Sequence, residues 1–322
     1  SPLIIGFGSG ENFIASDIPA LLPYTRKTCI LEDGELASVT ADQVDIYDGQ
    51  GSLLNKEITE IAWDIEEAEK GGYDHFMLKE IMEQPLVVRE TMRHRIDQEN
   101  KSVTLGEELG LSGNELKRLQ KIYIVACGTA YHAALLGKAV IEKLAAIPVE
   151  VDVASEFRYR EPLFNENQLV IVISQSGETA DTLAGLRLAR AKGVKVLAVT
   201  NVVGSTVSRE ADRVLYTRAG LEIAVASTKA YLTQLVALYL LAIYFGRQRE
   251  TISRDQAAEL IDGLMALPSQ LQDILIPEKV KELQGYCRHL AQWESAFFVG
   301  RNLDYPVAEE GALQLKEISY IH

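Results

Sequence analysis

Hydroxyl and amide side chains cluster in one short stretch of the chain. This stretch lies between the apolar run 169–173 and a helical pattern that ends at Gly193, and it reads Ser174-Gln175-Ser176-Gly177-Glu178-Thr179. The first N–H groups of a helix have no partner within the helix, and the helix dipole adds positive charge there. Hydroxyl and amide donors at such a point suit an anion, although simple helix capping produces the same pattern. We therefore expect a phosphate site, with capping as the alternative.

Two more turns of small polar residues stand where predicted helices begin. They are Cys127-Gly128-Thr129 and Ala226-Ser227-Thr228. Ligands of open parallel sheets lie beyond the carboxyl ends of the strands, next to helix starts. We therefore expect the three turns to converge on one phosphorylated polyol. The sequence contains neither a P-loop motif nor the glycine-rich dinucleotide motif, so these turns do not indicate a nucleotide site.

Acid–base candidates lie on a predicted helix near the end of the sequence. Glu310, Gln314 and Glu317 are spaced i, i+4 and i+7, which places them on one helix face. A carboxylate such as Glu317 is able to carry a proton between adjacent carbons of a bound sugar, whereas a solvated polar face is the plainer alternative. His94 and His132 are further acid–base candidates for which the sequence shows no partner.

Strand and helix patterns alternate from about residue 105 onward, as in a parallel sheet covered on both faces, so the predicted fold class is α/β. The apolar run 169–173 predicts a central strand, and the alternation in 149–153 predicts an edge strand. The other predicted elements are strands at 122–126, 195–200 and 213–216, and helices at 114–120, 131–145 and from about 227.

The earlier part of the chain has a different character. Residues 1–48 hold short β-rich runs broken by Gly, Asp and Pro, which predict antiparallel strands and the remnant of a larger domain. Residues 49–75 contain several glycines and an acidic run, which predict a linker. The first α/β domain, with its entry helices, is expected over 76–270.

A second unit is predicted near the end of the sequence, over 277–322. Residues 296–299 read as a strand, Gly300 as a turn and 307–320 as a helix, which repeats the opening around Gly128. We expect the start of a truncated duplicate of the first domain. The sequence also begins inside a strand pattern without Met, so we expect an interior piece of a longer protein.

Charge and cysteine content disfavour several classes of protein. The formal net charge is 32 − 46 = −14, which is unsuited to nucleic-acid binding. Cys29, Cys127 and Cys287 form neither a disulfide framework nor a metal motif, so we expect a cytoplasmic protein with no metal site. We expect Cys127 to pack rather than react. The longest apolar stretch, 230–245, falls short of the ~20 residues of a membrane span and predicts a core helix, with no membrane contact.

Several longer motifs resemble one enzyme family. They are the segments 127–129, 154–160, 174–182, 226–229 and 315–322. These motifs resemble glutamine:fructose-6-phosphate aminotransferase, also called glucosamine-6-phosphate synthase. Residues 10–17 resemble the end of that family's N-terminal glutaminase domain, so the likeness runs through nearly the whole chain.

The resemblance implies a fold and a reaction. The fold would be a three-layer sugar-isomerase (SIS) domain with a parallel sheet, preceded at 1–48 by a remnant of the glutaminase domain. The reaction would be glutamine-dependent conversion of fructose 6-phosphate to glucosamine 6-phosphate, by amino transfer and ketose–aldose isomerisation. Glu317 would be the catalytic residue that transfers the proton. The substrate-binding residues would be Gly128, Thr129, Ser174, Gln175, Ser176, Thr179, Val225 and Ser227.

The resemblance also implies what the full protein would need. It implies no cofactor, glutamine bound in an N-terminal domain outside this sequence, and a homodimer. The family's cysteine nucleophile, ring-opening histidine and Schiff-base lysine would lie outside residues 1–322. Two positions depart from the family pattern, because Ala130 replaces a serine and Gln314 replaces a lysine. The rate or the product of the reaction could differ as a result.

Two other classes of function remain open from the sequence. One is an aminosugar-phosphate isomerase or deaminase that does not use glutamine, which the departures at Ala130 and Gln314 favour. The other is a sugar-phosphate sensor that binds without turnover. Glu317 and the lack of a basic DNA-binding segment argue against the sensor.

Overall fold

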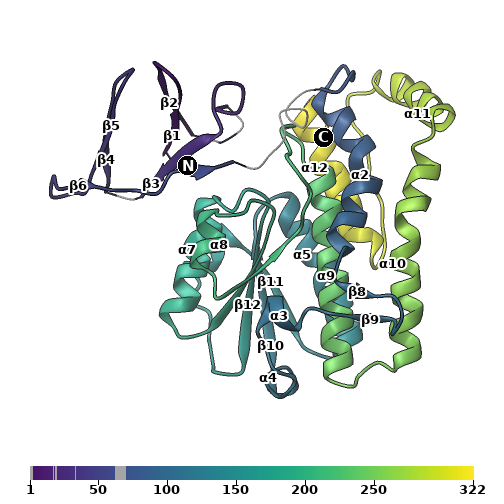
Figure 1. Cartoon of the computed structure of the whole chain (residues 1–322). Coiled ribbons are helices and arrows are strands. Elements are labelled where there is room, and N and C mark those ends of the chain that lie inside the picture. The colour runs from purple at the N-terminus through teal and green to yellow at the C-terminus, as the bar shows by residue number, and fades with distance from the viewer. Residues whose placement is uncertain (1–2, 17, 19, 33, 62–69) are drawn as a thin grey trace. The chain divides into compact units, whose positions relative to one another are not determined.

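A computed structural model describes residues 3–16, 18, 20–32, 34–61 and 70–322 of the chain (Figure 1). The chain divides into two compact units, which span residues 1–76 and 77–322. Each unit has its own sheets and its own hydrophobic core, so the two are described separately below.

The first unit is built from short antiparallel strands. One sheet has the order β2-β1-β3-β7, and the other has the order β4-β5-β6. Ile5, Cys29, Leu31 and Ile46 form a small shared core. The antiparallel strands expected over 1–48 are confirmed; β4 and β5, for example, pair on either side of the turn at 40–43. The strands are β1 Leu3–Phe7, β2 Asn12–Ala15, β3 Lys27–Leu31, β4 Leu36–Val39, β5 Val44–Tyr47, β6 Leu53–Leu54 and β7 Thr59–Glu60.

The stretch 49–75, expected to be a linker, contains two of these strands. β6 pairs with β5, and β7 pairs with β3. The sequence signal was weak because each strand has only two residues, too few to show an alternation of apolar and polar side chains. The acidic residues 66–69 lie outside the described residues.

The second unit is organised around a five-stranded parallel sheet with the order β11-β10-β12-β13-β14. The predicted strands are confirmed: β12 is central and buried at every position, and β11 is at an edge. The strands are β10 Lys121–Ala126, β11 Val149–Val153, β12 Gln168–Ser174, β13 Lys195–Thr200 and β14 Arg213–Tyr216.

Helices cover both faces of this sheet, which gives the three layers expected (Figure 1). Successive side chains of a strand point to opposite faces. Ile122 and Ile124 therefore pack into the core beneath α5 and α9, whereas Tyr123 and Val125 pack into a second core beneath α6 and α7. The covering helices are α5 Thr129–Ala145 and α9 Lys229–Gln248 on one face, and α6 Ala154–Phe157, α7 Ala180–Ala191 and α8 Thr206–Glu210 on the other.

The helix α9 fills the core rather than the surface. Its length and composition would suffice to cross a membrane, but 83% of its most apolar 18-residue window is buried inside the protein. A helix that is apolar on all sides is expected in the middle of a core. Gly137 of α5 permits close packing on α9, because a Cβ there would lie 2.9 Å from Leu238.

Shorter elements lead into the sheet. The first of the expected entry helices is α2 Phe76–Met92, which has Pro85 inside it. Ser112 and Glu115 form a reciprocal capping box at the start of α4, which explains the helix predicted there. The remaining elements of this segment are β8 Ile96–Asp97, β9 Ser102–Val103, α3 Gly106–Leu109 and α4 Gly113–Arg118.

The last part of the chain is helical and differs from the expected duplicate. The elements are α10 Arg254–Ile274, α11 Pro277–Leu290 and α12 Asp304–Ser319. The helix α12 confirms the one expected at 307–320, and it packs against α5. The strand expected at 296–299 is wrong in this structure: Phe297 and Val299 are 94% and 90% exposed and pair with no described strand. An apolar run forms a strand only beside another strand, and the described residues supply none there.

Candidate functional site

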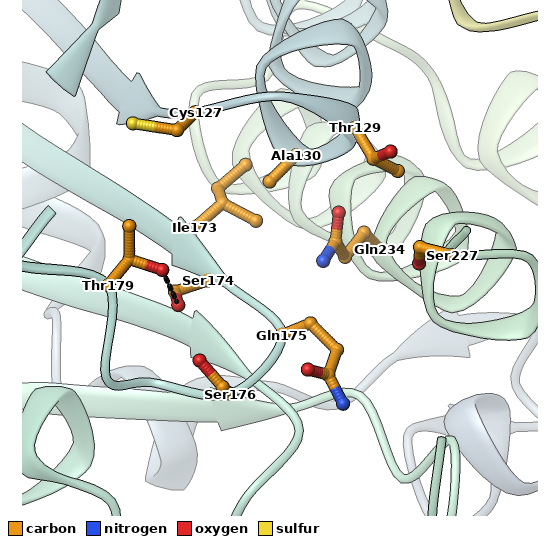
Figure 2. A pocket seen from close by; sticks show the side chains of 10 residues that line it. All are labelled: Cys127, Thr129, Ala130, Ile173, Ser174, Gln175, Ser176, Thr179, Ser227 and Gln234. Carbon is orange, nitrogen blue, oxygen red and sulfur yellow. Dashed lines mark hydrogen bonds between the residues drawn. The ribbon is translucent and has the colours of Figure 1, made fainter. Parts of the chain in front are cut away.

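A pocket of about 180 Å³ opens beyond the carboxyl ends of β10 and β12. The connections that leave these two neighbouring strands cover opposite faces of the sheet, which opens a crevice between the strand ends. Figure 2 shows that the side chains around the pocket come from turns far apart in the sequence. The lining residues are Cys127, Thr129, Ala130, Ile173, Ser174, Gln175, Ser176, Thr179, Ser227 and Gln234.

The three polar turns therefore meet at one site, as the sequence predicts. Each turn leads into a long helix, so the starts of α5, α7 and α9 all lie at the pocket. None of the ten lining side chains is charged. Helix starts with unpaired N–H groups and neutral donors suit an anion without the help of an ammonium or guanidinium group.

The Ser174–Thr179 turn is held in shape by its own hydroxyl groups. The N–H of Gly177 donates to Ser174 Oγ over 3.0 Å, and Ser174 Oγ lies 3.0 Å from Thr179 Oγ1 (Figure 2). The N–H of Glu178 donates to Ser176 Oγ over 3.2 Å. Thr179 is the N-cap of α7, but its hydroxyl makes no capping bond. Its hydroxyl is therefore used in the turn and not in the cap, which weakens the plain capping interpretation.

Gly177 is a position of this turn at which a larger residue would not fit. Its φ of +67° lies in the left-handed region, and a Cβ there would collide with the side chain of Ser205. The turn is therefore packed closely against the segment that enters α8.

Thr129, on the opposite wall, belongs to a network with α12. Its hydroxyl donates to Glu310 Oε1 over 2.9 Å, and Glu310 Oε2 lies 2.7 Å from His132 Nδ1. Gln314 Nε2 donates to the Ser227 carbonyl over 2.7 Å, to Glu310 Oε1 and to Thr129 Oγ1. Glu310 is only 4% exposed. The sequence placed Glu310 on the right helix face but gave no sign that His132 is its partner.

Ser227 is anchored in a similar way by a second, half-buried carboxylate. Its hydroxyl donates to Glu222, which also accepts the N–H groups of Thr228 and Ala230 at the start of α9. Burial raises the pKa of Glu222 above its ordinary value, and the nearby charge of Glu80 raises it further, against the effect of these hydrogen bonds. Glu80 in turn accepts the N–H groups of Ile223 and Ala224. Hydrogen bonds to the carboxylates of Glu80 and Glu222 therefore hold the 222–228 segment in place.

Gln234 is a lining residue that sequence reasoning missed. It is 2% exposed and lies on α9, and its Oε1 has no hydrogen-bond partner among the described residues. The available signal was an amide inside an otherwise apolar helix. Ala130 also lines the pocket, so the missing serine hydroxyl would have faced the site.

Three predicted site residues lie outside the lining of the pocket. Gly128 precedes α5 as its N-cap, with φ 55°. Val225 is 91% exposed, and Glu317 is an exposed residue of α12. The roles assigned to these three residues stay predictions. Within the described part of the chain, no group of three or more His, Cys, Asp or Glu side chains is arranged to hold a metal ion.

Comparison with known proteins agrees with this architecture. The SIS domain family matches residues 115–244. The "glutamine–fructose-6-phosphate aminotransferase [isomerizing]" of Caldanaerobacter subterraneus is 55% identical over all 322 residues, and that of Symbiobacterium thermophilum is 56% identical over 323 aligned positions. The solved C-terminal domain of glucosamine-fructose-6-phosphate aminotransferase from Francisella tularensis is 39% identical, with a TM-score of 0.74, and the match covers 79% of this chain and 70% of that one. This chain belongs to the glutamine–fructose-6-phosphate aminotransferase family.

The family membership confirms the resemblance drawn from the motifs, and the SIS fold expected from it. The chain spans about half the length of the curated relatives it matches, 52% in both. The aminotransferase activity of those relatives belongs to proteins of about twice this length.

Proposed function

We propose that the pocket binds fructose 6-phosphate, and that the full-length protein carrying this chain converts it to glucosamine 6-phosphate with glutamine as the nitrogen source. One observation carries the proposal: three polar turns converge on an uncharged pocket at the switch point of the sheet, in a chain 55% identical to named aminotransferases. Each wall of the pocket carries side chains that suit a different part of the substrate.

The Ser174–Thr179 turn is the proposed phosphate site. Ser176 and Thr179 offer hydroxyl protons, Gln175 offers an amide, and the first N–H groups of α7 stand beside them. Hydrogen bonds to a charged group each contribute about 1.5–3 kcal/mol, so a few such donors hold a phosphate without a lysine.

The Thr129 and Ser227 wall is the proposed site for the sugar hydroxyls. The Thr129 hydroxyl gives its proton to Glu310, and the Ser227 hydroxyl gives its proton to Glu222. A hydroxyl has a single proton, so both oxygens face the pocket as acceptors. Acceptors repel a phosphate dianion and suit the hydroxyl protons of the open-chain sugar. The backbone near Val225 is the third expected contact.

Glu317 is the proposed proton carrier. Its carboxylate would take a proton from C1 of the aminated ketose and return it to C2, which leaves the aldose product. Glu317 follows Glu310 by seven residues on α12, two turns along the same helix face. Glutamine hydrolysis in a separate domain, assembly as a homodimer and a cytoplasmic location are parts of the same proposal.

The test is an assay of the full-length protein with fructose 6-phosphate and glutamine, in which the product is identified as glucosamine 6-phosphate. We expect product only when both substrates are present. Glu317→Gln should lower kcat far more than it raises KM, because it removes proton transfer and not binding. Glucosamine 6-phosphate that forms with added ammonia but not with glutamine would support the isomerase or deaminase alternative, and a folded protein that binds without turnover would support the sensor.

A further inference from the structure

Glu310 is a buried carboxylate whose charge needs a partner. It lies between α12 and α5, and three side chains reach its two oxygens: Thr129, Gln314 and His132. Removing an ionised carboxylate from water is costly unless a cation or several hydrogen bonds compensate for it. The identity of the three partners therefore decides how this charge is balanced.

Only one of these partners can carry a positive charge. Thr129 offers a hydroxyl, Gln314 offers a neutral amide, and the imidazole of His132 lies 2.7 Å away through Nδ1. A further titratable neighbour is Tyr231, a half-buried residue whose pKa is raised by burial and then by the charge of Glu310. Tyr231 is neutral when protonated, so it cannot balance a carboxylate.

Gln314 reaches only one of the two carboxylate oxygens of Glu310. Its amide nitrogen has two protons and lies within hydrogen-bond distance of three acceptors: the Ser227 carbonyl, Thr129 Oγ1 and Glu310 Oε1. The Oε1 atom of the same amide is buried without a described partner. Thr129 and Gln314 both contact Oε1 of Glu310, whereas His132 is the hydrogen-bond partner of Oε2 among the described residues.

We propose that His132 is a positioning residue of the substrate site, which hydrogen-bonds through Nδ1 to Glu310 and so fixes the Thr129 hydroxyl for the bound sugar. The role of Thr129 as a sugar ligand rests on the proposed function. The pair itself rests on geometry alone: Nδ1–H donates to Oε2, Thr129 donates to Oε1, and Thr129 is left as an acceptor in the pocket. His132 is itself absent from the pocket lining, so it acts through Glu310.

The test is a set of variants of the full-length protein, with fructose 6-phosphate affinity measured by calorimetry and Tm measured without ligand. His132→Ala should weaken affinity about tenfold, the size of one misplaced hydrogen bond to the sugar. Gln314→Lys, which puts an ammonium one turn from Glu310, should restore the affinity of His132→Ala to within about threefold. In a Thr129→Val background, His132→Ala should cause almost no further loss of affinity. The matched control is His289→Ala, an exposed helix histidine on α11, which should change neither quantity.

Two results would overturn the proposal. One is a His132→Ala protein that keeps the affinity of the wild type. The other is additive behaviour of the substitutions. In that case Gln314→Lys does not restore the affinity of His132→Ala, and His132→Ala lowers affinity in the Thr129→Val background as much as it does in the wild type. If the wild type does not bind fructose 6-phosphate, the proposed function fails. The contact between His132 and Glu310 is then tested by the Tm values of the variants alone. His132→Ala should lower Tm by several degrees and Gln314→Lys should recover at least half of that loss; no recovery would refute the pair.

Discussion

Glu310 Oε2 lies 2.7 Å from His132 Nδ1, although 178 residues separate the two in sequence. The contact joins α12 to α5 beside the start of α5, where Thr129 enters the pocket. Through it, a helix of the last described segment of the chain supports the pocket from outside its lining, by contacts with Thr129 and with the Ser227 carbonyl. The geometry of the site therefore depends on α12 as well as on the three polar turns.

Glu310→Gln should destabilise the protein, because an amide nitrogen must then face the donors that now meet a carboxylate oxygen. A buried donor or acceptor left without its partner costs about 1–3 kcal/mol of the free energy of unfolding. Urea denaturation measures that cost. Glu317→Gln, an exposed position on the same helix, is the matched control and should stay within about 0.5 kcal/mol of the wild type. Equal losses in both variants would contradict the network described here.

Gly177→Ala should cost more than Gly193→Ala, although both glycines have positive φ. At Gly193, with φ +76°, a Cβ would meet open space, so only backbone strain of about 1–2 kcal/mol is expected. At Gly177 the Cβ also collides with Ser205, which adds about 1–3 kcal/mol. Denaturant unfolding gives the free energy of unfolding of each variant. The difference between the two losses is the cost of the collision with Ser205. Similar costs at both sites would show that the turn is not packed as described.

Ser176→Ala and Thr179→Ala should each weaken fructose 6-phosphate binding about ten- to a hundredfold while the fold stays intact. The reason is the loss of one hydrogen bond to a charged group, about 1.5–3 kcal/mol. Calorimetry gives the affinity and circular dichroism verifies the fold. Ser269→Ala, an exposed hydroxyl on α10, is the control and should bind as the wild type does. Unchanged affinity in both pocket variants would refute the phosphate assignment.

The half-buried carboxylate of Glu222 should make stability depend on pH in a specific direction. Its pKa is raised in the folded protein from an ordinary value of 4.5, so the folded state binds more protons than the unfolded state above that pH. The free energy of unfolding should therefore fall as the pH rises from about 4.5 through the raised value. Glu222→Gln should lessen this fall, whereas the exposed Glu259→Gln on α10 should keep it. If the contribution of Glu222 to the free energy of unfolding instead grew with pH over this range, its carboxylate would not be desolvated in the folded protein.

The parallel sheet and the phosphate turn could be predicted because both leave short-range marks in the sequence. An all-apolar run such as 169–173 identifies a central strand, and a polar turn that follows it identifies the strand's carboxyl end. The pairing of Glu310 with His132 leaves no such mark, since only packing of α12 on α5 brings the two together. The strand expected at 296–299 failed for a related reason: its apolar pattern was present, but strand formation depends on a neighbour that local sequence cannot supply.

The proposed function depends most on a phosphate held by neutral groups at the Ser174–Thr179 turn. A crystal structure of the full-length protein soaked with fructose 6-phosphate tests this directly. We predict density for the phosphoryl group within hydrogen-bond distance of Ser176 and Thr179, with sugar hydroxyls directed at Thr129 and Ser227. Clear density for the phosphoryl group at any other place in the protein, with this pocket empty, would contradict the central claim.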